Sequence, residues 1–559
     1  MKAKRSSILG LLVVLSLFVT QCGATPQPQT VVQTVEVEKT IIETVEVEKE
    51  VIQTVEVEKE VVKEVEVTAV PGDRKPEGTL RVALTGDPNS LYPPMNADQN
   101  ADNCNSQLFD SLLYLNPQGE LEPALAERWE MSESGDEYTF YLRTDVTFHN
   151  GEPFTADDVV ATWEYGRQPE NEFSDQFELA IAVEKVDDYT VKVRTDGPNP
   201  LLLSAIQDNW NIIPEKYMDE VGVDGFQEAP VGTGPFMFVE RMPGDHITFT
   251  ANPDYWREGY PLVETLIFRP IPESATRSVA IETHEIDIVP RLSPEEALRL
   301  VGAPGVTVVK YPLQRVYYIA FNNLTTGVGQ PTEDARVRQA MNHAVDVQAI
   351  VDVIFGGFGQ PAAGFITSTE LGGTAVEPMG YDPEKAKQLL ADAGYGDGFS
   401  MGMACPKGAY TNFEEVCEAV ASYLGEVGIT VELEFMESAQ YWDLEANKEL
   451  PPLFGDSWGS SEGEAYRRLV GALGGMDESF ASWSDPVIDD YLDQIAAAAD
   501  REARSKVYEE LQAYMQENPP FIYLYEPVSF EAINSRVQNY HPLPGEDYFL
   551  WDTWIATEE

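Results

Sequence analysis

The chain has 559 residues, of which 95 are Asp or Glu and 37 are Lys or Arg, giving a formal net charge of −58. Such an acidic surface repels nucleic acid and anionic membranes, so nucleic acid is not an expected partner. The length allows two or three lobes with sizeable cores, and no apolar stretch beyond the N-terminus is long enough to make the body a membrane channel.

The N-terminus predicts an export signal. Basic residues precede an apolar run at residues 8–19, which is too short to span a bilayer as a stable helix. Cys22 follows this run and resembles the cysteine of a bacterial lipobox, so we expect residues 1–21 to be a lipoprotein signal peptide and Cys22 to be lipidated. The alternative is an ordinary secretory signal with an incidental cysteine. Both interpretations place the body outside the cytoplasm, and lipidation would anchor it to the cell membrane.

A ten-residue repeat follows the signal. The sequence TVEVEK occurs at residues 34–39, 44–49 and 54–59, and a degenerate copy closes the series at residues 63–67. Alternating Val and Glu favour extended chain, although ten residues is also close to three helical turns, so a self-associating helical stalk remains an alternative. We expect residues 22–76 to form a low-complexity stalk without a packed core of its own.

The cysteines fit an oxidising compartment. Cys405 and Cys417 are close in sequence, so we expect them to form a disulfide, which leaves Cys104 over and buried. The sequence has no Cys-x-x-Cys motif and its histidines are scattered, so neither a metal site nor a cofactor is expected.

The first elements of the body follow from local patterns. Residues 78–84 predict a strand, residues 86–93 a turn-rich loop, residues 101–113 a helix and residues 138–143 an alternating strand. A further helix is expected after Thr155, which is a natural N-cap, with Trp163 on its buried side.

Several motifs then occur in a fixed order along the body. They are PALAERW at 123–129, the run from Phe140 to Val159, VGTGPF at 231–236, NPDYW at 252–256, EIDI at 285–288, DARVRQAM at 334–341 and the AKQLL and AGY elements within 381–395. In number, order and spacing they closely resemble the bacterial extracellular solute-binding proteins of family 5, the receptors of peptide- and nickel-type ABC importers. The resemblance extends from about Gly78 to the C-terminus.

This resemblance implies an α/β fold of the periplasmic-binding-protein type (type II, the large class with an extra inserted lobe). The solute-binding domain would span residues 77–559. Its lobe I would combine about 77–117, 205–309 and 525–559, the inserted lobe would be 118–204, and lobe II would be 310–524. Such receptors close around a solute by hinge motion. The implied partners are a small-molecule or peptide solute and the permease and ATPase subunits of the importer.

The same resemblance implies where the solute binds. The expected ligand-binding residues come from the loop after the first strand, the hinge strand, the loop around the GW motif of the family, and aromatic side chains nearby: Asn89, Leu91, Tyr318, Tyr410, Tyr441, Trp442, Trp458, Ser461 and Glu462. Ser461 stands where the family has an Asp that holds a peptide amino group, and Gly455 stands where oligopeptide receptors carry an Arg for the carboxylate. The aromatic side chains would also stack on a sugar, so an oligosaccharide is the alternative solute.

One motif suggests an enzyme. Residues 459–463 read GSSEG and fit the Gly-x-Ser-x-Gly nucleophile elbow, with Ser461 as the nucleophile and Asp485 and His541 following in the hydrolase order. No upstream oxyanion loop accompanies it, so we expect no catalysis and treat a serine hydrolase and a stalk-presented surface adhesin as the competing functions.

Overall fold

The computed structural model describes the body of the chain as one compact unit. The described residues are 75–95, 98–116, 121–171, 173–199, 201–460, 463–498 and 500–556. The expected signal peptide, Cys22, the stalk up to residue 74, Ser461 and Glu462 lie outside them. No helix in these ranges combines the length and the apolar character that a membrane span requires.

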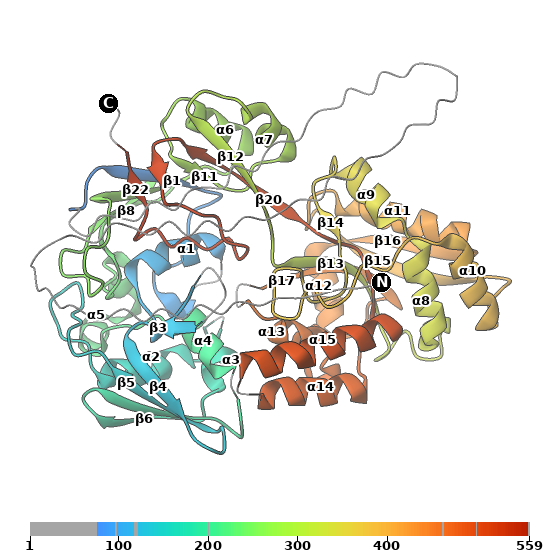
Figure 1. The fold of residues 1–559 in the computed structure, drawn as a ribbon, viewed down its shortest axis with the longest axis horizontal. Helices are drawn as coiled ribbons and strands as arrows, with labels where there is room; N and C mark the ends of the chain where they lie inside the picture. The colour runs from blue at the N-terminus through green and yellow to red at the C-terminus, as the bar shows by residue number, and fades with distance from the viewer. Residues whose placement is uncertain are drawn as a thin grey trace, which may run out of the picture. The chain divides into compact units, whose positions relative to one another are not determined.

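The first sheet collects strands from both ends of the body (Figure 1). In spatial order it contains β12 (Val306–Pro312), β20 (Val528–Asn534), β11 (Ile288–Val289), β1 (Thr79–Leu84), β10 (Thr265–Pro270), β9 (His246–Ala251) and β8 (Phe236–Met242). β1 lies where the sequence predicts a strand, and its Leu80, Val82 and Leu84 are buried in the core beneath the sheet. Strand β1 is parallel to β10 and β11, and β20 runs antiparallel to β11 and β12.

Helices cover this sheet on both sides. They are α1 (Gln99–Leu108), α5 (Glu215–Glu228), α6 (Ser274–Glu282) and α7 (Pro294–Leu300). The sequence predicted that the first helix would run to residue 113, and this boundary was wrong. Phe109 is extended, its N–H donates to the Asn105 carbonyl, and strand β2 (Leu113–Leu115) begins shortly afterwards.

A second sheet is inserted between α1 and α5 in the chain. It has the order β4 (Ala126–Met131), β5 (Glu137–Leu142), β7 (Thr190–Arg194) and β6 (Ala182–Asp187), and α2 (Ala156–Gly166), α3 (Ser174–Glu178) and α4 (Leu202–Asn209) accompany it. Thr155 is the N-cap of α2 as predicted, and the Asp158 carboxylate accepts hydrogen bonds from the Thr155 N–H and hydroxyl. Trp163 is buried and donates from Nε1 to the Phe177 carbonyl.

The third sheet belongs to the second half of the chain. Its order is β16 (Ile429–Glu437), β15 (Phe399–Lys407), β17 (Leu453–Gly459), β13 (Arg315–Phe321) and β18 (Phe521–Tyr523). The helices around it are α8 (Ala335–Ala344), α9 (Val347–Ile354), α10 (Pro383–Asp392), α11 (Phe413–Glu426), α12 (Ser438–Ala446), α13 (Tyr466–Leu473), α14 (Pro486–Ala497) and α15 (Arg501–Glu517), the last two packed side by side (Figure 1).

The remaining elements are short. They are β3 (Leu121–Pro123) paired with β2, β14 (Gln360–Pro361) paired with β19 (Tyr525–Glu526), β21 (Val537–Gln538) paired with β22 (Trp554–Ile555), and the 3₁₀ turns Pro93–Met95, Pro331–Glu333 and Gly475–Asp477.

Two chain segments connect the first sheet to the third. One is the link from β12 to β13, and the other runs from β18 through β19 to β20. They are hydrogen bonded to each other, since Leu313 N–H donates to the Pro527 carbonyl at 3.1 Å and Leu524 N–H donates to the Tyr317 carbonyl at 3.0 Å. The two connections therefore form a single ribbon, which is a suitable place for a hinge.

The VGTGPF loop needs its glycines for close approach. A Cβ on Gly234 would lie 2.5 Å from the carbonyl carbon of Leu108, and one on Gly232 would lie 2.1 Å from the Leu108 oxygen. Neither glycine has a positive φ. The role of these two residues is therefore to let the loop pack against the end of α1, where Gly234 N–H donates to the Leu108 carbonyl.

Candidate functional site

A cavity of about 680 Å³ lies between elements that belong to the first sheet and its helices and elements that belong to the third sheet and its helices. Its lining comes from α1, the β12–β13 link, β13, β17, α12, α13 and the C-terminal loop at residues 544–546. A neighbouring cavity of about 300 Å³ shares Gln99, Gln314 and Arg467 with it, so the two are parts of one crevice. Crevices of this size hold small molecules of several hundred daltons.

Aromatic side chains form one wall of the larger cavity. Tyr410 and Trp442 lie edge to face with ring centroids 6.3 Å apart, and Trp458 and Phe480 make a similar pair at 6.2 Å. Trp442 also packs on the fully buried Tyr441, whose hydroxyl donates to the Gly455 carbonyl. The wall is therefore a fixed apolar surface on which a planar or aliphatic part of a solute would stack.

Two buried carboxyl groups stand beside this wall. Asp456, on β17, accepts hydrogen bonds from the Tyr410 hydroxyl at 2.7 Å, the Tyr318 hydroxyl at 3.3 Å and the Ser457 N–H at 2.7 Å. Glu445, on α12, is only 3% exposed. Burial raises the pKa of both groups, and for Glu445 burial together with the neighbouring Asp456 raises the pKa to about 10. At neutral pH the pair therefore retains a proton.

Basic side chains line the same cavity. Arg315, on β13, donates from Nη1 to Ser457 Oγ at 2.9 Å. Among the described residues no carboxylate forms an ion pair with it. Arg291 is instead held in a two-pronged pair by Glu546, with distances of 2.9 and 2.6 Å. The cavity thus presents acidic and basic groups to one solute.

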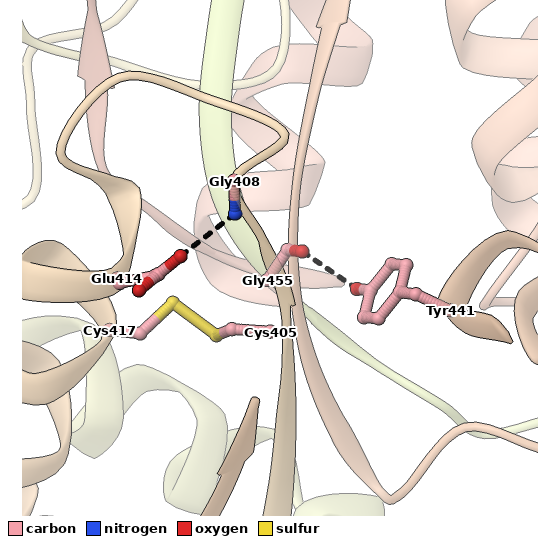
Figure 2. The surroundings of a disulfide bond; sticks show 6 residues. All are labelled: Cys405, Gly408, Glu414, Cys417, Tyr441 and Gly455. Carbon is pink, nitrogen blue, oxygen red and sulfur yellow. Dashed lines mark hydrogen bonds between the residues drawn. A yellow bond between two sulfur atoms is a disulfide. The ribbon is translucent and has the colours of Figure 1, made fainter. Parts of the chain in front are cut away.

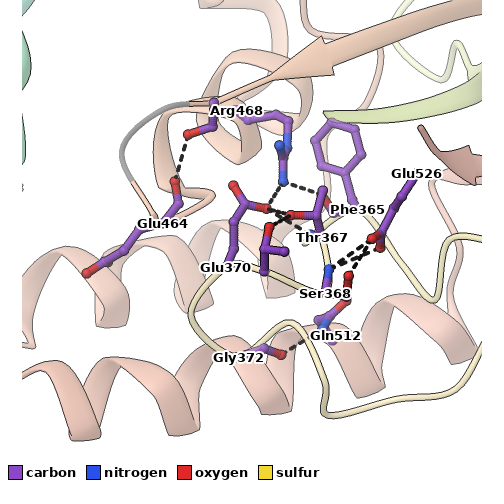
Figure 3. Close-up of polar contacts among 11 residues, drawn as sticks. Phe365, Thr367, Ser368, Glu370, Gly372, Glu464, Arg468, Gln512 and Glu526 are labelled. Carbon is purple, nitrogen blue, oxygen red and sulfur yellow. Dashed lines mark hydrogen bonds and ion pairs between the residues drawn. The ribbon is translucent and has the colours of Figure 1, made fainter. Parts of the chain in front are cut away.

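A buried polar cluster fixes the helix behind the cavity (Figure 3). Arg468, on α13, donates to Glu370 and to the Phe365 carbonyl, and both charged side chains are fully buried. Ahead of α13, Glu464 pairs with Arg504 of α15 at 2.6 Å. Because replacing one member would leave a buried charge, this cluster holds α13 rigidly against α15 and the loop that contains Glu370.

A disulfide supports the other side. Cys405 at the end of β15 is joined to Cys417 on α11, and both residues are fully buried (Figure 2). The enclosed loop carries Tyr410, and the Gly408 N–H donates to the Glu414 carboxylate at 2.8 Å. Cys104 is free and buried, and burial raises the pKa of its thiol.

The smaller cavity has a different chemistry. The guanidinium of Arg257 lies over the rings of Tyr114, Trp256 and Trp551, at 4.5 to 5.0 Å from their centroids. Asp110 accepts bonds from Thr233, Tyr255 and Trp256, and burial raises its pKa to about 6. Stacking and hydrogen bonds within the protein thus engage much of this surface, and the larger cavity is the better candidate for the solute.

The structure separates the predicted site residues into three groups. Tyr410, Trp442 and Trp458 line the larger cavity. Leu91, Tyr318 and Tyr441 are at most 2% exposed, lie in hydrophobic cores and line neither cavity, so their contact with solute stays a prediction. Asn89 lies on an exposed loop, where its amide side chain donates to the Met95 carbonyl, and it lines neither cavity.

Sequence reasoning did not select Glu445, Asp456 or Arg315, although all three line the cavity. Asp456 stands two residues before Trp458 on the same strand, so the available signal was its alternation with Trp458 along β17. Glu445 follows Trp442 by three residues, which places both on one side of α12. Arg315 carried no comparable signal, because its position depends on the pairing of β13 with β17.

Comparison with known families gives a match over most of the body. The model of the bacterial extracellular solute-binding proteins, family 5 (middle region), matches residues 120–477, which is more than half of the chain. Heme-binding protein A of Haemophilus influenzae is 29% identical over 463 residues, covering 77% of this chain and 83% of its own. The dipeptide-binding protein of Escherichia coli is 27% identical over 453 residues, covering 75% and 84%.

Solved structures share the fold. HbpA2 from Haemophilus parasuis has a TM-score of 0.78 and 27% identity, with 86% of this chain and 100% of that chain covered. The ABC transporter-associated binding protein DppA from Helicobacter pylori, in complex with the peptide STSA, has a TM-score of 0.68 and 25% identity, with 86% and 98% covered. The α/β fold expected from the sequence is therefore confirmed as the periplasmic-binding-protein fold.

Proposed function

The chain belongs to the bacterial extracellular solute-binding proteins of family 5, and from this premise we propose that its solute is a peptide-like molecule held in the larger cavity. The protein is an extracytoplasmic solute-binding protein of an ABC importer, and members of this family are binding receptors rather than enzymes. The serine-hydrolase alternative, which depended on Ser461, has no support from the family.

One observation carries the choice of a peptide. Within one cavity of about 680 Å³, Arg315 faces the solute space as a cation while Glu445 and Asp456 supply acidic groups. A peptide has a carboxylate for Arg315, an amine and side chains that suit the aromatic wall, whereas a neutral sugar would leave Arg315 without a carboxylate partner. The dipeptide-binding protein of Escherichia coli, named above among the relatives, is consistent with this choice.

We expect the receptor to capture its solute by closing about a hinge. A solute that contacts lobe I and lobe II at the same time would stabilise the closed arrangement. The ribbon formed by the two connecting segments would bend to allow closure. The boundaries proposed for lobe I (77–117, 205–309 and 525–559), the inserted lobe (118–204) and lobe II (310–524) assign each of the three large sheets mainly to one lobe.

The envelope attachment is part of the same proposal. A signal peptide at residues 1–21, lipidation of Cys22 and a stalk at residues 22–76 would tether the receptor near its permease and ATPase subunits. Metabolic labelling with an alkyne fatty acid tests the anchor, because a Cys22→Ala variant should lose the label.

Calorimetric titration of the full-length protein tests the solute class. The probes are pools of two- to five-residue peptides and pools of oligosaccharides, followed by mass spectrometry of the recovered solute. A saturable heat with peptide pools and recovery of intact peptide supports the proposal. If only oligosaccharides bind, the solute is an oligosaccharide and not a peptide. Recovery of cleaved peptide would contradict the receptor role.

A further inference from the structure

We propose that an electrostatic latch in the smaller cavity holds lobe II against lobe I and the inserted lobe, and that it acts without solute. Lobe II contributes the guanidinium groups of Arg467 and Arg501. The opposite side contributes an aromatic ring and three carboxyl groups, those of Phe173, Asp102, Asp208 and Asp547. The inference rests on the proposed receptor function and goes beyond it, because it concerns closure of the protein and not the identity of the solute.

The lining of the smaller cavity provides the first observation. With the lobe boundaries proposed above, all three lobes contribute to it. Arg467 stands at the start of α13 and Arg501 at the start of α15. The carboxyl groups come from Asp102 on α1, Asp208 on α4 and Asp547 in the C-terminal loop. Cations and carboxyl groups of different lobes therefore border one space, so they attract each other when the lobes close.

One contact between these lobes is already formed. The Arg467 guanidinium lies 5.4 Å from the centroid of the Phe173 ring, which is within the range of a cation–π interaction. Phe173 directly precedes α3 in the inserted lobe, whereas α13 belongs to lobe II. The contact therefore connects two lobes that the chain joins through lobe I and the ribbon.

Both partners of this contact are held in place by their own lobes. The Phe177 ring on α3 stacks on Trp210 with centroids 5.3 Å apart, which fixes the helix that follows Phe173. On the other side, the buried ion pair between Arg468 and Glu370 fixes α13 (Figure 3). Because neither side chain can follow the other far, opening of the lobes breaks the contact. Its loss is an energetic cost of opening.

The carboxyl groups attract a cation because they crowd one another. Burial raises the pKa of Asp547 well above its usual value, and the neighbouring Asp208 and Asp102 raise it further. The Nε atom of Arg501 is buried and donates to no acceptor among the described residues. A guanidinium that approaches these carboxyl groups relieves their mutual repulsion and supplies hydrogen-bond donors, so it stabilises the closed arrangement.

Such a latch sets the population of the closed form before solute binds. A solute that requires the closed form binds with an apparent affinity proportional to the fraction of closed protein. Weakening the latch therefore lowers the affinity for every solute by one common factor. Loss of a contact with the solute itself would instead change the affinities for different solutes by different factors.

Double electron–electron resonance on the full-length protein without solute measures the open and closed populations. Spin labels on a ketone-bearing amino acid at Glu133 and Asp493 report the distance between the inserted lobe and lobe II, and no cysteine is replaced. Both positions are exposed and line neither cavity. We expect a closed population in wild type at low salt. About 0.5 M NaCl should reduce it, because salt screens the charges.

Two variants weaken the latch and leave the larger cavity intact. Phe173→Leu keeps an apolar side chain but removes the aromatic face, and Asp208→Asn keeps the shape but removes a charge. Neither residue lines the larger cavity. Each variant should lower the ratio of closed to open protein by about twofold to fivefold. Glu178→Gln is the matched control and should leave the ratio unchanged, because Glu178 is an exposed carboxylate on α3 that lines neither cavity.

Calorimetry with peptides of different sequence supplies a second readout. Each of the two variants should weaken binding of all peptides by one common factor, at most as large as the change in the ratio. If wild type has no closed population without solute, or if both variants leave the ratio unchanged, the inference is overturned while the receptor function stands. If no peptide binds, the proposed function fails, and the populations without solute still decide whether the latch exists.

Discussion

Arg315 gives the clearest test at the scale of a single residue. Its guanidinium donates to the neutral Ser457 hydroxyl in the larger cavity, so it has donors to offer a solute carboxylate. We expect Arg315→Met to weaken binding of peptides with a free C-terminus by about tenfold or more and to leave C-terminally amidated peptides nearly unaffected. Calorimetry with the two peptide forms measures this. An equal loss for both forms would contradict a carboxylate contact.

His149 sets a pH dependence of stability. Its Nδ1 accepts from the Gly232 N–H at 3.2 Å, and its Nε2 contacts the Gly234 carbonyl at 3.0 Å, an arrangement that requires the neutral ring. Burial lowers the pKa of His149 from 6.5 to about 4. Between these pH values the unfolded chain binds the extra proton, so this contribution is present above pH 6.5 and is lost as the pH falls towards 4.

We therefore expect wild type to lose more stability than His149→Gln when the pH is lowered from 7 to 5. Urea unfolding at both pH values measures the free energy of unfolding for each protein. The difference between the two proteins isolates His149 from opposing groups such as Glu531, whose pKa burial raises to about 7. Equal pH dependence in both proteins would refute the assignment.

Residue placement was only partly predictable from the sequence. Tyr410, Trp442 and Trp458 line the larger cavity, and their contact with solute stays a prediction. Tyr318 lies in the core, packed against Phe365 and Phe521, because the pleat of β13 and its pairing with β17 and β18 decide which face a side chain occupies. The pairing of Glu445 with Asp456 depends on how α12 packs beside β17, and no local pattern in the sequence carries that information.

At the scale of elements, the disulfide connects β15 with α11. Cys405 and Cys417 are 12 residues apart, and in the chain-entropy model closing a loop of about this length stabilises the folded state by about 3 kcal/mol. We expect the Cys405→Ala, Cys417→Ala double variant to lose roughly that free energy of unfolding by urea titration. Wild type unfolded in a reducing agent should approach the variant, and a loss well below 1 kcal/mol would contradict this account.

Element boundaries show where local signals suffice. Thr155 is the N-cap of α2 as predicted, because an N-cap and acidic first-turn residues are a local signal. The end of α1 was misplaced because the apolar spacing continues through Leu112 and Leu113, which are buried in a neighbouring core and not on the helix. The order of the family motifs, in contrast, carried the long-range topology that local patterns do not.

For the whole molecule, the net charge of −58 has a measurable consequence. Mutual repulsion of the acidic groups opposes the compact state, and salt screens it, with a Debye length of about 30 Å at 0.01 M and about 3 Å at 1 M. We expect the Tm to rise as NaCl is increased between these limits, and KCl to give the same rise. A Tm that is constant or falls with salt would contradict a stability limited by repulsion.

The central claim is that a peptide-like solute binds in the larger cavity and contacts lobe I and lobe II at the same time. Hydrogen–deuterium exchange of the full-length protein, with and without the best-binding peptide pool, tests it most directly. The account predicts slower exchange in α12, in β17 and in the loop at residues 544–546, which together line the cavity. Slower exchange confined to lobe I or to lobe II, or located away from these segments, would contradict the claim.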